Sequence, residues 1–272
     1  MEFDHILYEV IDQVAWITLN RPDQLNAFAG DMRDELLQAV LAAQEDPGVK
    51  TLVLTGSGRA FCAGGDVKQM AALKAEEEGF DKLRPLLDQG RRIVTVVHQC
   101  PKPVLAMVNG LAAGAGCNLA LACDLRVASD HAVFQQSAIK LGLHPDWGGS
   151  FFLPRLVGAG RALEMMLTGK RVEAEEAQEI GLVQQVVPAA HLREHTARLA
   201  RRLAQAPSTA SRLIKLAVYN SLHYDLESMM DFETEAQQQC WASPESTEGI
   251  QAHTQRRRPV FGQNLPGGSL LL

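Results

Sequence analysis

The amino-acid sequence predicts an α/β fold followed by a helical C-terminal region. Up to residue 127, short runs of β-forming residues alternate with runs in which apolar residues recur at helical spacing. Beyond residue 187 the strand patterns stop, and helical patterns continue to residue 251. Strands that alternate with helices pair largely in parallel, through right-handed crossovers. We therefore expect a mainly parallel sheet covered by helices, joined to a helical subdomain.

The first predicted unit is a strand, a helix and a second strand. Residues 14–19 are rich in β-forming side chains and stop shortly before Pro22, which is typical of a strand that enters a loop. Asp31 is expected to cap a helix over residues 32–43, where apolar residues have helical spacing. Residues 51–55 form a short apolar run that predicts a buried strand.

The same alternation continues along the chain. Further helices are predicted over residues 67–74, 80–97, 113–123, 189–204 and 208–223, and further strands over residues 103–108 and 125–127. We divide the chain into a core, residues 1–200, and a C-terminal helical subdomain with a loose tail, residues 201–272.

Composition excludes several classes of protein. A chain of 272 residues with 46% hydrophobic and 21% charged residues is globular rather than disordered or fibrous. The net charge of −6 argues against general nucleic-acid binding, although Arg256, Arg257 and Arg258 form either a phosphate-binding patch or a solvated helix end. No apolar run reaches the roughly 18 residues of a membrane span, and the acidic N-terminus does not resemble a signal peptide. We expect no membrane association and a cytoplasmic location.

Cysteine and histidine patterns do not favour a metal site. The five cysteines have no Cys-x-x-Cys spacing, so we interpret them as reduced, mostly buried thiols. His191 and His195 would share one helix face, but Leu192 stands where zinc proteases carry a glutamate, and arginines surround the pair. A solvated basic face is the favoured interpretation, and we predict no bound metal.

Two loops rich in small residues could donate backbone hydrogen bonds to a ligand. Residues 110–116 lie between a predicted strand and a predicted helix, and N–H groups at a helix start favour negative charge. Residues 59–66 have a similar position. Together they could stabilise the oxyanion of an enolate. Tight packing alone would also explain the small residues, and Asp66 could act only as a helix N-cap.

Asp146 is the candidate catalytic base. It lies between Pro145 and Trp147, where burial against an aromatic side chain would raise its pKa towards a useful range. A rival interpretation makes Asp146 the N-cap of a helical segment that follows over residues 149–156. The residue pattern alone leaves both interpretations open.

Several motifs in a fixed order resemble the crotonase superfamily, the enoyl-CoA hydratase and isomerase family. The matching segments cover nearly the whole chain, from residue 3 to about residue 262. They are residues 17–22 with Asn26, residues 60–66, 102–110, 114–117, 167–177 and 181–183.

The resemblance implies a fold and a ligand. The family fold is a spiral of ββα units with a C-terminal helical trimerisation region, which replaces the plain sheet expected above. The family binds acyl-CoA thioesters, and the backbone N–H groups of Gly65 and Ala115 would form the oxyanion hole. No separate cofactor is implied, because coenzyme A is part of the substrate. Its binding residues would be Arg59, Ala63, Gly65, Asp66, Val67 and Lys68, with Arg256 to Arg258 of a neighbouring subunit as further cations in a trimer or hexamer.

Departures from the family pattern favour an isomerase. Family hydratases use two glutamates to activate water, and the matching positions here are Asn118 and Ala138. Asp146, by contrast, falls where some isomerases of the family carry an aspartate. The segment 140–149 most resembles the ring-epoxide isomerase type of phenylacetate degradation, which acts on 1,2-epoxyphenylacetyl-CoA. Phe134, Trp147 and Phe151 could form apolar walls for a ring, or could be plain core residues.

The leading hypothesis is an acyl-CoA isomerase of fatty-acid or phenylacetate metabolism, in which Asp146 transfers a proton. One alternative is an enoyl-CoA hydratase that uses a displaced acid, such as Glu77 or Glu78. A second alternative is a non-catalytic subunit that only binds CoA esters.

Overall fold

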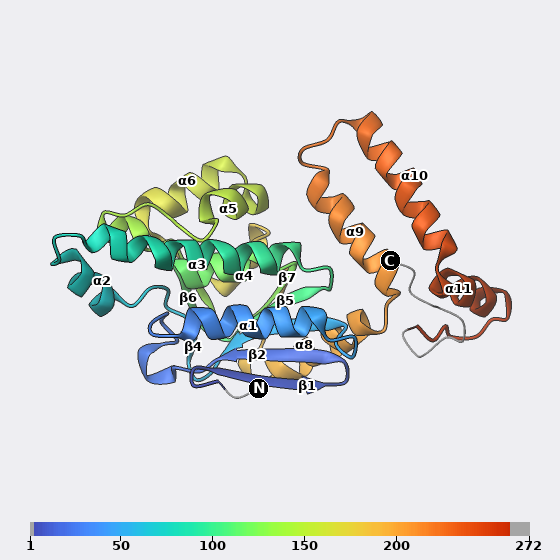
Figure 1. Cartoon of the computed structure of the whole chain (residues 1–272), viewed down its shortest axis with the longest axis horizontal. Helices are drawn as coiled ribbons and strands as arrows, with labels where there is room; N and C mark the ends of the chain where they lie inside the picture. The colour runs from blue at the N-terminus through green and yellow to red at the C-terminus, as the bar shows by residue number, and fades with distance from the viewer. Residues whose placement is uncertain (1–2, 262–272) are drawn as a thin grey trace.

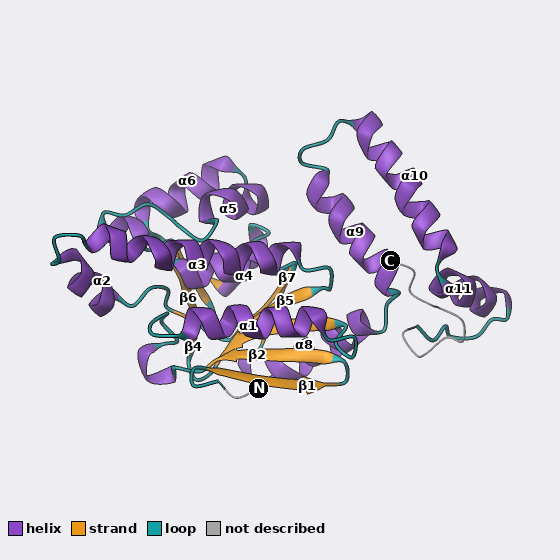
Figure 2. Cartoon of the chain, in the orientation of Figure 1, coloured by secondary structure: helices purple, strands orange, loops and turns teal. Residues whose placement is uncertain are grey.

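The structure is a computed structural model that describes residues 3–261, and it contains two β-sheets surrounded by helices (Figures 1 and 2). The larger sheet has the spatial order β1 (Ile6–Ile11), β2 (Val14–Leu19), β3 (Thr51–Gly56), β5 (Val104–Val108), β7 (Leu125–Ser129) and β10 (Gln185–Val187). The smaller sheet has the order β4 (Ala60–Cys62), β6 (Leu111–Ala113), β8 (Val133–Gln135) and β9 (Arg171–Glu173). Neighbouring strands run parallel except for β1 with β2 and β8 with β9.

The helices connect and cover these sheets. They are α1 (Met32–Glu45), α2 (Val67–Lys74), α3 (Gly79–Gln99), α4 (Ala115–Ala122), α5 (Gly149–Val157), α6 (Ala159–Thr168), α7 (Ala174–Glu179), α8 (Leu192–Ala204), α9 (Ser208–Asn220), α10 (Leu226–Ala242) and α11 (Pro244–Thr254). Short 3₁₀ turns occupy Pro22–Gln24, Ala138–Leu141 and Ala189–His191.

The repeating unit is two strands followed by a helix. In each of the pairs β3–β4, β5–β6 and β7–β8, the first strand joins the larger sheet and the second joins the smaller one. This arrangement confirms the ββα spiral and corrects the plain parallel sheet expected from periodicity. The strands of the smaller sheet have only three residues each, which is too short for a periodic pattern to be visible in the sequence.

The longer predicted elements agree with the structure. The strand over residues 14–19 and the helix over residues 67–74 have the predicted bounds, and the other predicted elements differ at their ends by a few residues. The expected cap of α1 is wrong: Asp31 stands at the N-cap position, but its side chain makes no capping hydrogen bond. Its backbone, with φ −81° and ψ 0°, lacks the extended geometry that directs an N-cap side chain to the helix N–H groups.

Helix α8 covers one face of the larger sheet. Leu192, Ala200 and Ala204 of α8 pack in one buried cluster with strand residues such as Trp16 and Val53. Helices α1, α3 and α4 pack in the main core together with the opposite sheet face. Beyond α8, helices α9 to α11 extend away from the sheets, on the right of Figure 1. The division of the chain near residue 200 stays a prediction, and residues 262–272 of the expected tail lie outside the described residues.

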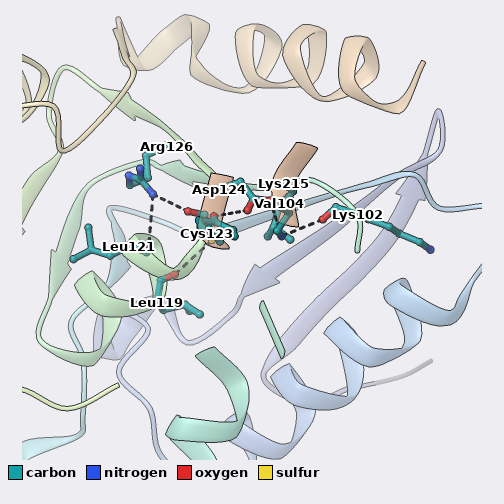
Figure 3. A network of polar contacts seen from close by, with 9 residues as sticks. Lys102, Val104, Leu119, Leu121, Cys123, Asp124, Arg126 and Lys215 are labelled. Carbon is teal, nitrogen blue, oxygen red and sulfur yellow. Dashed lines mark hydrogen bonds and ion pairs between the residues drawn. The ribbon is translucent and has the colours of Figure 1, made fainter. Parts of the chain in front are cut away.

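A partly buried polar cluster attaches α9 to the core (Figure 3). The Asp124 carboxylate, on the turn between α4 and β7, accepts hydrogen bonds from Val104 N (2.7 Å), Lys215 Nζ (2.9 Å) and Tyr219 Oη (2.6 Å). The side chains of Lys215 and Asp124 are only 12% and 16% exposed. This ion pair is therefore poorly screened by solvent and fixes the start of the C-terminal region.

A buried arginine closes the C-terminal end of α4. Arg126 is 1% exposed, and its guanidinium donates to the carbonyl oxygens of Cys123 (2.7 Å) and Leu182 (2.6 Å) and, more weakly, of Leu121 (3.5 Å; Figure 3). The last carbonyls of a helix lack intrahelical partners and carry partial negative charge. A cation at that end therefore satisfies them and fixes the axis of α4.

We predict that Lys215→Met destabilises the protein by about 1–3 kcal/mol, because the Asp124 carboxylate keeps its burial and loses its only cationic partner within residues 3–261. Urea unfolding followed by circular dichroism measures the change. The matched control is Lys170→Met, which breaks the more exposed pairs with Glu164 and Glu176 and should change stability much less, because solvent screens these charges. Equal effects of the two substitutions would contradict this account of the cluster.

Candidate active site

The two small-residue loops lie side by side because they follow neighbouring parallel strands. Strand β4 pairs with β6 in the register Ala60 to Leu111 and Cys62 to Ala112. Both strands therefore end on the same side of the smaller sheet, and ligands bind at the carboxyl ends of parallel strands in many α/β proteins. The loop after β4 carries Gly65, and the turn after β6 leads directly into α4 at Ala115.

The first turn of α4 touches the end of β4. A Cβ atom placed on Gly116 would lie 2.2 Å from the carbonyl oxygen of Cys62, so only glycine permits this approach. The contact fixes the start of α4 against the loop that carries Gly65. Two backbone segments from different turns of the spiral are thereby held in one relative position.

Gly65 and Ala115 each present an unused backbone N–H. Phe28 N donates to Gly64 O (2.8 Å), Asp66 N donates to Phe28 O (3.3 Å), and Gly64 N donates to Cys62 Sγ (3.4 Å). Those bonds use the N–H groups on either side of Gly65. Within residues 3–261, Gly65 N and Ala115 N donate to no protein acceptor. The structure thus brings together the two donors that the sequence predicts for the oxyanion hole, with the N-terminus of α4 behind one of them.

The first loop is also tied to the N-terminal part of the chain. Asn26 has a left-handed backbone (φ 57°), and its side-chain oxygen accepts from Arg21 N (2.9 Å). Its Nδ2 donates to the carbonyl oxygens of Ser57 and Ala60, both at 2.9 Å. Asn26 belongs to the motif that carries the family resemblance, but its bracing role could not be read from the sequence.

The residues predicted to hold coenzyme A lie along this loop. Asp66 caps α2, accepting from Lys68 N (2.9 Å) and Gln69 N (3.2 Å), so the capping interpretation of its side chain is confirmed. Ala63 N donates to Leu25 O (2.9 Å). The side chains of Arg59, Val67 and Lys68 are exposed. Neither Arg59 nor Lys68 forms an ion pair with the rest of the described chain, so both cations are available to a phosphate.

Asp146 has a carboxylate without a structural task. Its backbone carbonyl accepts from Gly149 N (2.9 Å), but α5 has Gly148 as its N-cap residue and no side-chain capping bond. The alternative that Asp146 caps this helix is therefore wrong. The residue keeps solvent contact in the single chain, yet the surrounding protein atoms raise the pKa of its carboxyl group by desolvation. Its own backbone N–H and the nearby side chains of Arg33 and His144 act in the opposite direction.

Arg33 is the main buried cation near Asp146. It is 7% exposed, its Nη2 donates to Phe28 O (3.2 Å), and its guanidinium lies 5.7 Å from the centre of the Phe28 ring. Phe28 in turn stacks on Trp147 with ring centres 4.4 Å apart. Within the described chain, Arg33 Nε and Nη1 have no hydrogen-bond partner, and burial lowers the pKa of this side chain. The sequence reasoning missed Arg33, because an arginine in an amphipathic helix usually lies on its solvated face.

The two positions that carry glutamates in family hydratases do not supply an acid. Asn118 is completely buried on α4, where its Nδ2 donates to Asp146 O (2.8 Å) and its Oδ1 accepts from Gln136 Nε2 (2.8 Å). Ala138 begins the 3₁₀ turn after β8. Glu77 and Glu78, the displaced acids considered above, lie exposed between α2 and α3.

An open cavity of about 400 Å³ lies between α3 and α5, next to the Asp146 segment. Its walls include Val94 and His98 of α3, with Trp147, Phe151 and Phe152 on the other side. Trp147 and Phe151 therefore border this cavity, whose lining also includes the polar side chains of Arg91, Thr95 and Gln99. Phe134 does not, because it lies in β8 and is 0% exposed, packed within the main core.

Other sequence-predicted groups lie away from this site or are already paired. Arg257 forms a two-pronged contact with Glu248 (2.6 and 2.8 Å), which lowers the pKa of Glu248 to about 2, whereas Arg256 and Arg258 are exposed. His195 contacts Gln185. The part of the chain that the structure describes contains no cluster of three or more His, Cys, Asp or Glu residues able to hold a metal, and it has no helix long and apolar enough to cross a membrane.

The buried-thiol prediction agrees with the structure. Cys62, Cys117 and Cys123 are fully buried, and burial raises the pKa of each thiol to about 12. A thiol that stays protonated at neutral pH is a poor nucleophile. Cys62, although it lies beside the two free N–H groups, is therefore a packing residue.

Comparisons with known proteins agree with this geometry. Residues 9–264 match the family model described as enoyl-CoA hydratase/isomerase. A probable enoyl-CoA hydratase of Rhodobacter capsulatus is 40% identical, and the match covers 96% of this chain and 99% of that protein. The 1,2-epoxyphenylacetyl-CoA isomerase of Escherichia coli is 37% identical, with coverage of 96% and 98%.

Solved structures show the same similarity. The crystal structure of an enoyl-CoA hydratase from Bacillus anthracis is 35% identical to this chain, with a TM-score of 0.90 and coverage of 95% of this chain and 99% of that one. The similarity thus extends over the spiral, the two loops and the C-terminal helices. The chain belongs to the enoyl-CoA hydratase/isomerase family.

Proposed function

We propose that the protein is an acyl-CoA isomerase in which Asp146 transfers the proton. The observation that carries this proposal is the Asp146 carboxylate, which within the described residues forms no ion pair and caps no helix, and whose pKa the surrounding protein atoms raise. The two positions that match the acids of family hydratases are occupied by Asn118, which donates to Asp146 O, and by Ala138. A base with a raised pKa transfers protons more effectively near neutral pH than an ordinary aspartate. The relatives carry both hydratase and isomerase names, so their names alone do not choose between the reactions.

The proposed reaction proceeds through an enolate. With a 3-enoyl thioester, Asp146 removes a proton from C2, and the electrons of the C–H bond move into the thioester to form a dienolate. Its negative oxygen accepts hydrogen bonds from Gly65 N and Ala115 N, each of which contributes about 3–4 kcal/mol if it resembles other oxyanion donors. The protonated Asp146 then returns the proton to C4, which leaves the double bond between C2 and C3. One carboxylate serves both steps.

Hydration is the less favoured reaction, because it needs an acidic side chain that positions the attacking water and transfers protons. Asn118 uses its carboxamide oxygen and one N–H for protein contacts, and an amide does not transfer protons at neutral pH. Glu77 and Glu78 are solvated. The alternative remains distinguishable, because hydration adds water to the product whereas isomerisation leaves its mass unchanged.

A ring-bearing acyl group is the second substrate class that we propose. The cavity between α3 and α5 is lined by Trp147, Phe151 and Phe152, and aromatic walls suit a planar ring. The 37% identical relative from Escherichia coli is named for a ring epoxide. On such a substrate Asp146 would assist the rearrangement of the epoxide instead of a double-bond shift.

We also propose that the active form is a homo-oligomer, a trimer or a pair of trimers. Helices α9 and α10 expose large apolar side chains, with Ile214 63%, Leu226 78% and Trp241 70% exposed in the single chain. So much exposed apolar surface on neighbouring helices is typical of a protein interface. Exposed Arg256 and Arg258 of one subunit could then reach the CoA phosphates of another.

We predict that Asp146→Asn lowers the kcat for isomerisation of 3-enoyl-CoA by at least about 100-fold, because the amide cannot accept the C2 proton. The affinity for CoA esters should not change. Ultraviolet absorbance of the conjugated product measures turnover, and calorimetry measures binding. The matched control is Asp130→Asn on the exposed β7–β8 turn, which should keep full activity.

Crotonyl-CoA hydration is assayed in parallel with the same two variants. Isomerisation that persists in Asp146→Asn, or hydration that is faster than isomerisation in the wild type, would refute the proposed function. Unchanged CoA-ester affinity with no turnover of any thioester by the wild type would instead indicate a binding subunit.

We predict that kcat/KM falls as the pH decreases through a pKa above the ordinary aspartate value of 3.8, because burial raises the pKa of Asp146 and only its ionised form is a base. Arg33→Met should move this inflection to higher pH, since Arg33 stabilises the ionised form. pH–rate profiles of both proteins test this sign. An inflection that moves to lower pH in Arg33→Met would show that the buried cation does not act on the catalytic base.

We predict a multimeric mass for the wild type in light scattering coupled to gel filtration. Leu226→Glu combined with Trp241→Glu should reduce that mass, because a charge placed in an apolar interface is costly to bury. Glu233→Lys, an exposed charge change on the same helix, serves as the control. A monomeric wild type would contradict the proposed assembly.

A further inference from the structure

Asn118 joins the helix of the proposed oxyanion hole to the segment of the proposed base. It lies on α4, one helical turn after Ala115, and is completely buried. Its Nδ2 donates to the backbone carbonyl of Asp146 at 2.8 Å. A direct hydrogen bond therefore connects the two parts of the site that must act on the same acyl group.

The orientation of the Asn118 carboxamide is fixed by its partners. A backbone carbonyl only accepts hydrogen bonds, so the Asn118 atom that faces Asp146 O must be the nitrogen. The Asn118 oxygen then faces Gln136, whose Nε2 donates to it at 2.8 Å. Gln136 is 1% exposed, and its own Oε1 has no partner in residues 3–261. Gln136 thus leaves one buried acceptor unsatisfied while it holds Asn118.

Gly149, in the segment that carries Asp146, packs directly against the Asn118 carboxamide. A Cβ atom on Gly149 would lie 2.6 Å from Asn118 Nδ2, so any larger residue would push the carboxamide away from Asp146. Gly149 N also donates to the Asp146 carbonyl, at 2.9 Å. The Asp146 carbonyl therefore has two donors, one from its own segment and one from α4.

The segment held in this way has a conformation that requires support. Trp147 has a positive φ of 47°, which is an unfavourable backbone conformation for a large side chain. Such a conformation persists only where neighbouring contacts determine it. Here these are the stacking of Trp147 on Phe28 and the hydrogen bond from Asn118 to Asp146.

We propose that Asn118 is a positioning residue for Asp146, fixing the segment that carries the base relative to the N–H of Ala115. The proposal rests on the proposed function, because the residue that Asn118 positions is the proposed base. It assigns Asn118 no contact with substrate. The position that holds a water-activating acid in family hydratases thus aligns a different base in this chain.

The test compares Asn118→Leu and Gly149→Ala in the isomerisation assay. Leucine has the same number of side-chain heavy atoms as asparagine and branches at the same carbon, but it has no donor. Gly149→Ala displaces the carboxamide by direct contact, because its Cβ would overlap the Asn118 side chain. Both should lower kcat about 10- to 100-fold and leave the KM for the CoA ester within about twofold, because a misplacement near 1 Å costs about that much in rate. Gly160→Ala is the matched control, since its Cβ would have no neighbour within 4 Å.

The outcomes separate this inference from the proposed function. Wild-type kcat in both Asn118→Leu and Gly149→Ala, or a loss confined to KM, would overturn the positioning role. Activity retained in Asp146→Asn would overturn the proposed function itself. If Asn118→Leu does not fold, as judged by circular dichroism, Gly149→Ala alone decides, because alanine is compatible with the first turn of α5.

Discussion

The site depends on the close contact between the first turn of α4 and the end of β4. At Gly116 the two backbones approach so closely that a Cβ would overlap the Cys62 carbonyl oxygen. This contact sets the position of Ala115 relative to Gly65, and hence the separation of the two free N–H groups. The opposite end of α4 is fixed by Arg126, and Asn118 near its middle bonds to Asp146 O. One short helix thus determines where the proposed oxyanion and the proposed base meet.

The electrostatics of the site combine opposing effects of moderate size. Desolvation raises the pKa of Asp146, whereas the buried charge of Arg33 lowers it. Desolvation favours the protonated carboxyl group and a nearby cation favours the ionised form, whereas full solvation would leave Asp146 a weak base. Phe28 holds Arg33 in this position. Arg33 donates a hydrogen bond to the Phe28 carbonyl oxygen, and the Phe28 ring stacks on Trp147. Because Phe28 O also accepts from Asp66 N, one residue connects the base to the loop of Gly65.

Sequence patterns predicted the long elements and the loops but not the contacts between them. Most strands of five or six residues and most helices of two or more turns repeat a period often enough to be recognised, whereas β4, β6 and β8 have three residues each. Two longer elements, β1 and α6, were not predicted. Family motifs, rather than periodicity, indicated the second sheet. Asp146 stood out through its neighbours in the chain. Arg33, Gln136 and the hydrogen bond of Asn118 depend on approaches between distant segments. Of the two interpretations of Phe134, the core residue is correct, because β8 directs its side chain into the main core.

The central claim is that a single carboxylate carries the proton from C2 to C4. The direct measurement uses 3-enoyl-CoA that bears deuterium at C2, converted in ordinary water and analysed by mass spectrometry with fragment assignment. The expected product is the conjugated thioester, with no added water in its mass and with part of the label retained at C4. A C4 hydrogen derived entirely from solvent, or a product that has gained a molecule of water, would contradict the claim.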